Sequence, residues 1–333
     1  MGDEIKPNRN LQVEGLRGLA ILIVVVYHTF CRYQQIFMDS NIVWMQDFGT
    51  FGVGIFLLIT CFFLVDFSSS KYNDGFRLLD YLKKKFLRLW PCYAVCISII
   101  SIVIHIAELP NRMSSFVDWV LNIFFVNGFI GTPYVDGAHW YMTVLVSFLV
   151  IMAVARKLGI DTKPIFYILC VSLCMAVSLF GIPMSNALIG GAHIGYLCIA
   201  VALRAFFQSN ASQKDKRFYF RWGSVFLAGI LAIYQFKGIV CVLELILILP
   251  ILIGSLMGKL PVLENRVFQF LGTISYALYL IHQNMIYEIQ YYLTYFTGEY
   301  NYLFGIVAIA LIIPIAYLLY TLIEKEQPKK VNG

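Results

Sequence analysis

Long apolar runs recur along the whole chain, and many approach the roughly 20 residues that a helix needs to cross a bilayer. Of the 333 residues, 60% are hydrophobic and 13% are charged, whereas soluble domains average roughly 45–50% apolar and about 25% charged residues. A surface of this composition would not remain in water. The sequence therefore predicts an all-α fold, a polytopic transmembrane helical bundle that forms a single domain over residues 1–333, with short tails at about 1–13 and 325–333.

Hydropathy divides the chain into ten predicted spans. The distribution of basic residues tests this number, because cytoplasmic loops hold an excess of Lys and Arg. Of the 25 Lys and Arg residues, ten spans leave only Arg32, Arg112 and Lys237 outside and put the other 22 on the inner side. An error of one span would invert every later loop, so this asymmetry favours ten spans with both termini in the cytoplasm. The predicted spans are 16–37, 48–68, 89–109, 139–155, 164–182, 190–207, 222–236, 238–257, 270–292 and 302–323.

Three further features have simpler explanations. The stretch "WVLNIFFVNGFIG" at 119–131 contains two Asn and two Gly, so we expect it to be interfacial or re-entrant. Most of the eight cysteines lie in apolar runs without zinc-type spacing and are predicted to be small buried hydrophobes. The inner loops account for the net charge of +6, which gives no reason to expect nucleic acid as a partner.

The first predicted span carries three ionisable residues, Glu14, Arg17 and His28. Arg17 and His28 are eleven positions apart, so on a helix they differ by about 20° in azimuth and about 16 Å along the axis. Glu14 stands three residues before Arg17, close enough to pair with it. An ionisable side chain at the depth of His28 is costly unless it faces protein or water, which makes it a functional candidate. The alternative is a structural His that is hydrogen-bonded to a neighbouring helix.

The ninth predicted span, "LGTISYALYLIHQNMIYEI", carries a second polar stripe. Ser275, Tyr279 and His282 follow the spacing i, i+4, i+7 and share one helical face. His282 lies at a depth close to that of His28, so the two histidines could line a shared polar cavity. A neutral His at this depth can accept a proton from a hydroxyl group.

Two groups of residues at the membrane surfaces are candidates for binding sites. On the inner side, "YLKKKFLRLWP" supplies a cationic dock for an acyl donor with a CoA tail through Lys85 and Arg88, unless these charges serve only topology. On the outer side, "DGAHWYM" places His139, Trp140 and Tyr141 where they could bind a sugar or form an interfacial aromatic belt. Glu244, within the eighth span, is a buried acid with no assigned role.

The chain resembles the membrane-bound acyltransferase family 3, bacterial O-acyltransferases that modify cell-surface polysaccharides. The resemblance runs over nearly the whole chain and rests on five segments in the same order. These segments are "VEGLRGLAILIVVVYH", "FGVGIFLLITCFFL", "KKKFLRLWPCY", "HWYM" and "ISYALYLIH". Thr60 and Cys61 stand where members of the family commonly have Ser-Gly, and Lys85 replaces the first Arg of Arg-x-x-Arg. Lys keeps the charge but loses the bidentate geometry of Arg.

The resemblance implies transfer of an acyl group, most often acetyl from cytoplasmic acetyl-CoA, to a sugar hydroxyl of a lipid-linked or polymeric glycan such as O-antigen. It implies His28 as the essential histidine and Arg17 as its partner, in a bacterial inner-membrane protein. We expect Arg17, Lys85 and Arg88 to bind acyl-CoA. We expect His139, Trp140, Tyr141, Ser275, Tyr279 and His282 to bind the acceptor or the thioester oxygen. Acetyl-CoA is a co-substrate in this scheme, which needs no tightly bound cofactor and no metal; direct transfer and a transient acyl-histidine both fit.

One alternative belongs to another functional class. A proton-coupled transporter or exporter could use Glu14, Arg17, His28, Glu244 and His282 as a relay within ten spans. An acyltransferase of the other polytopic histidine family fits less well, because the length of the chain and the first-helix segment disagree with it. A transporter differs from both because it forms no ester.

Overall fold

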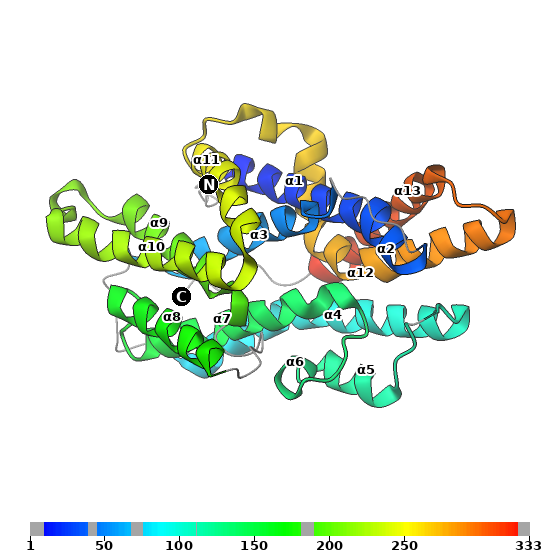
Figure 1. The fold of residues 1–333 in the computed structure, drawn as a ribbon, viewed down its shortest axis with the longest axis horizontal. Coiled ribbons are helices and arrows are strands. Elements are labelled where there is room, and N and C mark those ends of the chain that lie inside the picture. Colours follow the sequence, from blue (N-terminus) through cyan, green and yellow to red (C-terminus); the bar gives the residue numbers. More distant parts are fainter. Residues whose placement is uncertain (1–9, 39–44, 68–75, 111, 181–189, 326–333) are drawn as a thin grey trace, which may run out of the picture.

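The computed structural model describes residues 10–38, 45–67, 76–110, 112–180 and 190–325. Within these ranges the chain is helical and contains no strand (Figure 1). The longer helices are α1 (Leu11–Tyr27), α3 (Phe48–Phe62), α4 (Leu78–Ala107), α7 (Trp140–Lys157), α8 (Pro164–Leu179), α9 (Ile194–Gln208), α10 (Lys216–Lys237), α11 (Ile239–Leu256), α12 (Arg266–Thr297) and α13 (Tyr302–Leu319). The all-α prediction is confirmed.

Each of the ten predicted spans overlaps one of these helices. By length and composition, six helical segments of the described chain can cross a membrane, and α3 and α8 are shorter apolar helices. The six segments are Leu11–Phe37, Leu78–Ala107, Gly137–Lys157, Gly191–Gln208, Ile239–Leu256 and Tyr302–Glu324. The number ten stays a prediction, as does the cytoplasmic location of the termini, since most of both tails lies outside the described residues.

Two segments that were predicted to lie at the membrane surfaces, 83–88 and 119–131, are helical in the structure. The basic segment at 83–88 was expected to precede a span, but α4 begins at Leu78 and includes it. The apolar stretch at 119–131 forms α5 (Phe116–Ile123) and α6 (Asn127–Ile130). Both helices are too short to cross a bilayer.

The first helix changes its hydrogen-bonding pattern at the candidate histidine. Asn10 caps α1 by accepting hydrogen bonds from the backbone N–H groups of Gln12 and Val13, at 3.0 and 3.1 Å. The α-helix then continues to Tyr27, and residues His28–Arg32 form a π-helical turn before α2 (Tyr33–Phe37). π-Helical turns of this kind occur frequently at functional sites.

Helices α1, α3 and α12 lie in the middle of the bundle, with α9 and α10 side by side on one flank and α13 on the other (Figure 1). α1 lies directly on α12 because glycines remove side chains from the contact. A Cβ atom on Gly18 would lie 2.0 Å from the Phe268 carbonyl oxygen, and one on Gly272 would lie 2.1 Å from the Glu14 carbonyl oxygen. Small residues are the usual means by which membrane helices approach this closely.

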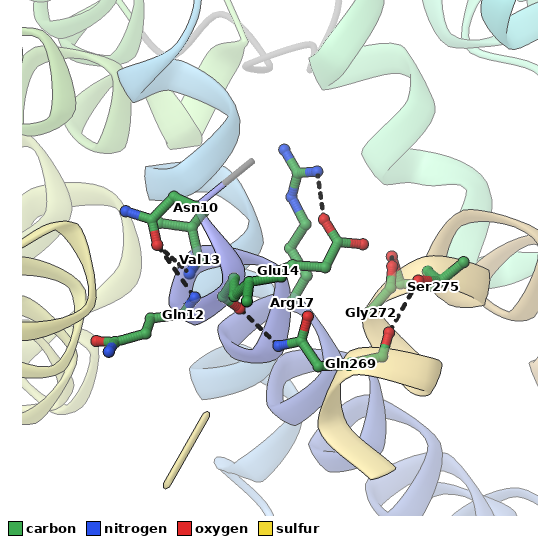
Figure 2. Close-up of polar contacts among 10 residues, drawn as sticks. Asn10, Gln12, Val13, Glu14, Arg17, Gln269, Gly272 and Ser275 are labelled. Carbon is green, nitrogen blue, oxygen red and sulfur yellow. Dashed lines mark hydrogen bonds and ion pairs between the residues drawn. The ribbon is translucent and has the colours of Figure 1, made fainter. Parts of the chain in front are cut away.

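Polar side chains fix the register of this helix pair at its N-terminal end. Gln269 donates hydrogen bonds from Nε2 to the carbonyl oxygens of Leu11 and Leu263, at 2.6 and 2.8 Å. Gln12 donates to Glu264 Oε1 at 2.7 Å and accepts from the Leu260 backbone N–H at 2.7 Å. Figure 2 shows Gln269 reaching from α12 to the first turn of α1.

The close approach can be tested with a pair of glycine substitutions. We expect Gly18→Ala to lower the melting temperature, because its Cβ would meet backbone atoms that cannot rotate away and overpacking costs about 1–3 kcal/mol. Gly223→Ala on α10 is the matched control, since a Cβ there meets nothing within 4 Å. The measurement is thermal unfolding of both purified variants in the same detergent; equal melting temperatures would contradict the packing argument.

Candidate active site

The two candidate histidines, which sequence reasoning placed at one depth without evidence of contact, lie against each other. The imidazole rings of His28 on α1 and His282 on α12 have centroids 4.9 Å apart and are inclined at 72°. His282 is fully buried, whereas His28 is half-buried. The α1 and α12 contact at Gly18 and Gly272 brings these rings together.

A tyrosine that the sequence did not single out contacts one histidine of this pair. The hydroxyl oxygen of Tyr287 lies 3.0 Å from His28 Nδ1. Tyr287 is fully buried, and the guanidinium of Arg112 lies over its ring at 5.3 Å from the centroid. Because Nδ1 is engaged, Nε2 is the His28 nitrogen that can meet a substrate. Tyr287 stands five residues after His282, off the predicted polar stripe, so its spacing gave no signal.

Aromatic rings continue from the histidine pair to α7. Tyr279 on α12 lies 5.6 Å from His282 between ring centroids, and Tyr141 on α7 lies 5.3 Å from Tyr279. The Tyr141 hydroxyl is 3.2 Å from the Thr60 hydroxyl on α3. Four predicted residues, His28, His282, Tyr279 and Tyr141, therefore form one continuous row.

Three groups that were expected to donate hydrogen bonds to a substrate already donate them to backbone carbonyl oxygens. Ser275 Oγ donates to the Gly272 oxygen at 2.8 Å, and the Tyr279 hydroxyl donates to the Ala138 oxygen. His282 Nδ1 lies 2.7 Å from the Tyr279 carbonyl oxygen, which can only accept. In this structure these residues shape the site rather than present free donors.

The other predicted residues of the outer rim have defined partners. His139 Nε2 donates to the Leu280 carbonyl oxygen at 2.8 Å and so attaches the start of α7 to α12. One face of Trp140 stacks on His193, with 4.6 Å between ring centroids and 21° between ring planes. Asp136 reinforces the attachment through a contact of 3.2 Å from the Asn284 backbone N–H to its Oδ2.

The residues that we predict to bind the acyl donor lie on two sides of one turn of α12, N-terminal to His282. Glu14 and Arg17 form an ion pair at 3.6 Å, shown beside Gly272 and Ser275 in Figure 2. On the other side of this turn, the Tyr276 hydroxyl donates to the Leu89 carbonyl oxygen at 2.8 Å, one residue beyond Arg88. Arg88 is exposed, and Lys85 is half-buried with its Nζ 5.4 Å from the Tyr81 ring centroid. α12 thus brings the two groups of cations to the same level.

Comparison with known proteins shows the family of the chain. No curated protein and no solved structure matches the chain. A family model described as an acyltransferase domain matches residues 10–321, which include both histidines and the cations Arg17, Lys85 and Arg88. The chain therefore belongs to the membrane-bound acyltransferase family 3.

Proposed function

We propose that this membrane acyltransferase is an O-acetyltransferase, which moves an acetyl group from cytoplasmic acetyl-CoA to a sugar hydroxyl of a cell-surface glycan such as O-antigen. The observation that carries this proposal is the His28 imidazole within a membrane helix bundle, with Nδ1 held by Tyr287 and Nε2 left for a substrate. Membership of the acyltransferase family favours this chemistry over transport. The protein would act in the bacterial inner membrane.

The donor would bind at the inner ends of α1 and α4. Arg17, Lys85 and Arg88 supply positive charge for the phosphates of acetyl-CoA, and Arg88 offers the bidentate geometry that phosphate prefers. Gly272 lies at this level and His282 ten residues further along α12, so the axial distance to the histidines is about 15 Å. The thioester arm would have to extend along α12 over this distance.

His28 would then act at the acceptor hydroxyl. Its Nε2 removes the hydroxyl proton while the hydroxyl oxygen attacks the acetyl carbon, and the leaving CoA sulphur receives the proton when the carbon–sulphur bond breaks. His139, Trp140 and Tyr141 at the start of α7 would border the acceptor path from the outer side.

The thioester carbonyl oxygen needs a hydrogen-bond donor that stabilises its developing negative charge. The Thr60 and Tyr141 hydroxyls have two protons and make one hydrogen bond with each other. One of these protons therefore has no acceptor among the described residues, unlike the protons of Ser275, Tyr279 and His282. We assign the donor role to this pair, in which Thr60 occupies the position where relatives of the family commonly have Ser.

The transporter alternative receives less support from the geometry. It requires Glu244 to join a relay with the histidines. In the described part of the chain, Glu244 Oε1 accepts a hydrogen bond from Thr50 of α3 at 2.8 Å. The contacts of His28 and His282 run to Tyr27, Tyr279, Tyr287 and each other.

The acetyl-transfer proposal predicts that His28→Ala abolishes acetylation. General-base catalysis contributes about 10²–10⁴-fold, so we expect at least about a 100-fold loss of rate. The measurement is proton NMR of surface polysaccharide from cells that express the wild type or the variant at equal membrane levels. His105→Ala is the control, since His105 is exposed and its Nδ1 lies 2.7 Å from the Ser101 carbonyl oxygen of its own helix. Acetyl esters that persist in the His28 variant would exclude His28 as the catalytic group.

The donor site predicts a separate effect for Arg88→Ala. We expect the KM for acetyl-CoA to rise roughly 10- to 100-fold, because a hydrogen bond to a charged group contributes about 1.5–3 kcal/mol. The KM for the acceptor glycan should stay unchanged. Radiolabelled acetyl transfer in membrane vesicles measures both constants, with Lys163→Ala, an exposed cation at the start of α8, as the control. An acetyl-CoA KM equal to that of the wild type would place the donor elsewhere.

A further inference from the structure

His282 has a proton arrangement that its surroundings fix. Its Nδ1 lies 2.7 Å from the Tyr279 carbonyl oxygen. A carbonyl oxygen can only accept, so Nδ1 carries the hydrogen and the neutral ring holds its lone pair on Nε2. The backbone of α12 therefore selects the tautomer of this histidine.

In the part of the chain that the structure describes, the lone pair of His282 has no partner. Nε2 has no hydrogen-bond donor among the described residues. Because the side chain is fully buried, solvent does not supply a donor either. Buried polar atoms are paired in the great majority of cases, and an exception calls for a functional explanation. Nε2 is the distal nitrogen of the ring, and the rings next to this side chain are His28 at 4.9 Å and Tyr279 at 5.6 Å between centroids.

The groups that face His28 show what this lone pair can do. Tyr27 lies 5.1 Å away between ring centroids, and Tyr287 engages Nδ1. Arg32 stands four residues after His28 in the same π-helical turn, and the Arg112 guanidinium lies over the Tyr287 ring at 5.3 Å from its centroid. Two cations oppose the formation of a charged imidazolium. His282 is the neighbouring neutral group that has an unused lone pair to favour it.

We infer that His282 is a positioning residue for His28, which stays neutral and presents its Nε2 lone pair to stabilise the His28 imidazolium during acyl transfer. The proton passes from the acceptor hydroxyl to His28 Nε2 and then to the CoA sulphur, while the oxygen–carbon bond forms and the carbon–sulphur bond breaks. His282 keeps its single proton throughout. This inference rests on the proposed function, and it assigns His282 a role different from donating a hydrogen bond to the thioester.

Two substitutions separate the lone pair from the packing role of the ring. In His282→Asn the side-chain amide can still donate to the Tyr279 carbonyl from the position of Nδ1, but the acceptor at Nε2 is lost. In His282→Gln the longer side chain can place the amide oxygen near the position of Nε2. Both variants are smaller than the wild type, so a loss of packing would affect both.

The experiment measures acetyl transfer from radiolabelled acetyl-CoA to the glycan fraction that the wild type acetylates, with each protein in lipid nanodiscs. Because general-base catalysis supplies about 10²–10⁴-fold and His28 remains, we expect His282→Asn to lower kcat by about tenfold or more. Both KM values and the melting temperature should stay close to those of the wild type. We expect His282→Gln to recover a large part of the lost kcat.

The outcomes distinguish this inference from the proposed function. A kcat for His282→Asn within about twofold of the wild type, with His28→Ala inactive, would overturn the role of His282 and leave the acetyltransferase intact. Equal losses in the folded Asn and Gln variants would also overturn it, since the lone pair would not be the property that matters. A wild type that transfers no acetyl group to any surface glycan would contradict both proposals.

Discussion

The close contact between α1 and α12 determines the rest of the site. Carbonyl oxygens of each helix lie where side chains of the other would begin, at Gly18 and Gly272. In a membrane no hydrophobic driving force favours contact between helices over contact with lipid, so packing and interhelical hydrogen bonds must hold them. Gln269 supplies such a bond at the N-terminal end of the pair, and Gln12 bonds to Glu264 just before α12. The histidines further along can meet because this crossing leaves no room for intervening side chains.

The same contact explains why charged groups are tolerated here. Glu14 is buried and is paired with Arg17, and His282 is anchored to the backbone of its own helix. Ionisable residues at membrane depth usually face the interior of a bundle and pair there. The surface that faces lipid is different: α11 and α13 carry exposed leucine, isoleucine and valine side chains. The polar groups of the candidate site lie on α1, α3, α7 and α12.

Helical periodicity predicted the parts of this arrangement that depend on one helix at a time. Arg17 and His28, and separately Ser275, Tyr279 and His282, could be assigned to faces because a helix fixes azimuth and depth. The contact between the two faces could not be predicted, since it depends on which glycines pack against which backbone. Tyr287 was not predicted as a site residue for a related reason. A tyrosine in an apolar helix is usually an interfacial or packing residue, and only the position of α1 gives it His28 as a partner.

The hydrogen bonds also show which of the predicted site residues already use their donor groups within the protein, which residue type alone does not show. Ser275, Tyr279, His139 and His282 are all potential donors by chemistry, yet each has a backbone carbonyl as acceptor. These bonds connect α12 internally and to the start of α7. Arg17, Lys85 and Arg88 lie beside the first turns of α12, and the His28–His282 pair lies further along. The acyl transfer that we propose would need the two substrates to move toward His28, whose Nδ1 lies against the Tyr287 hydroxyl.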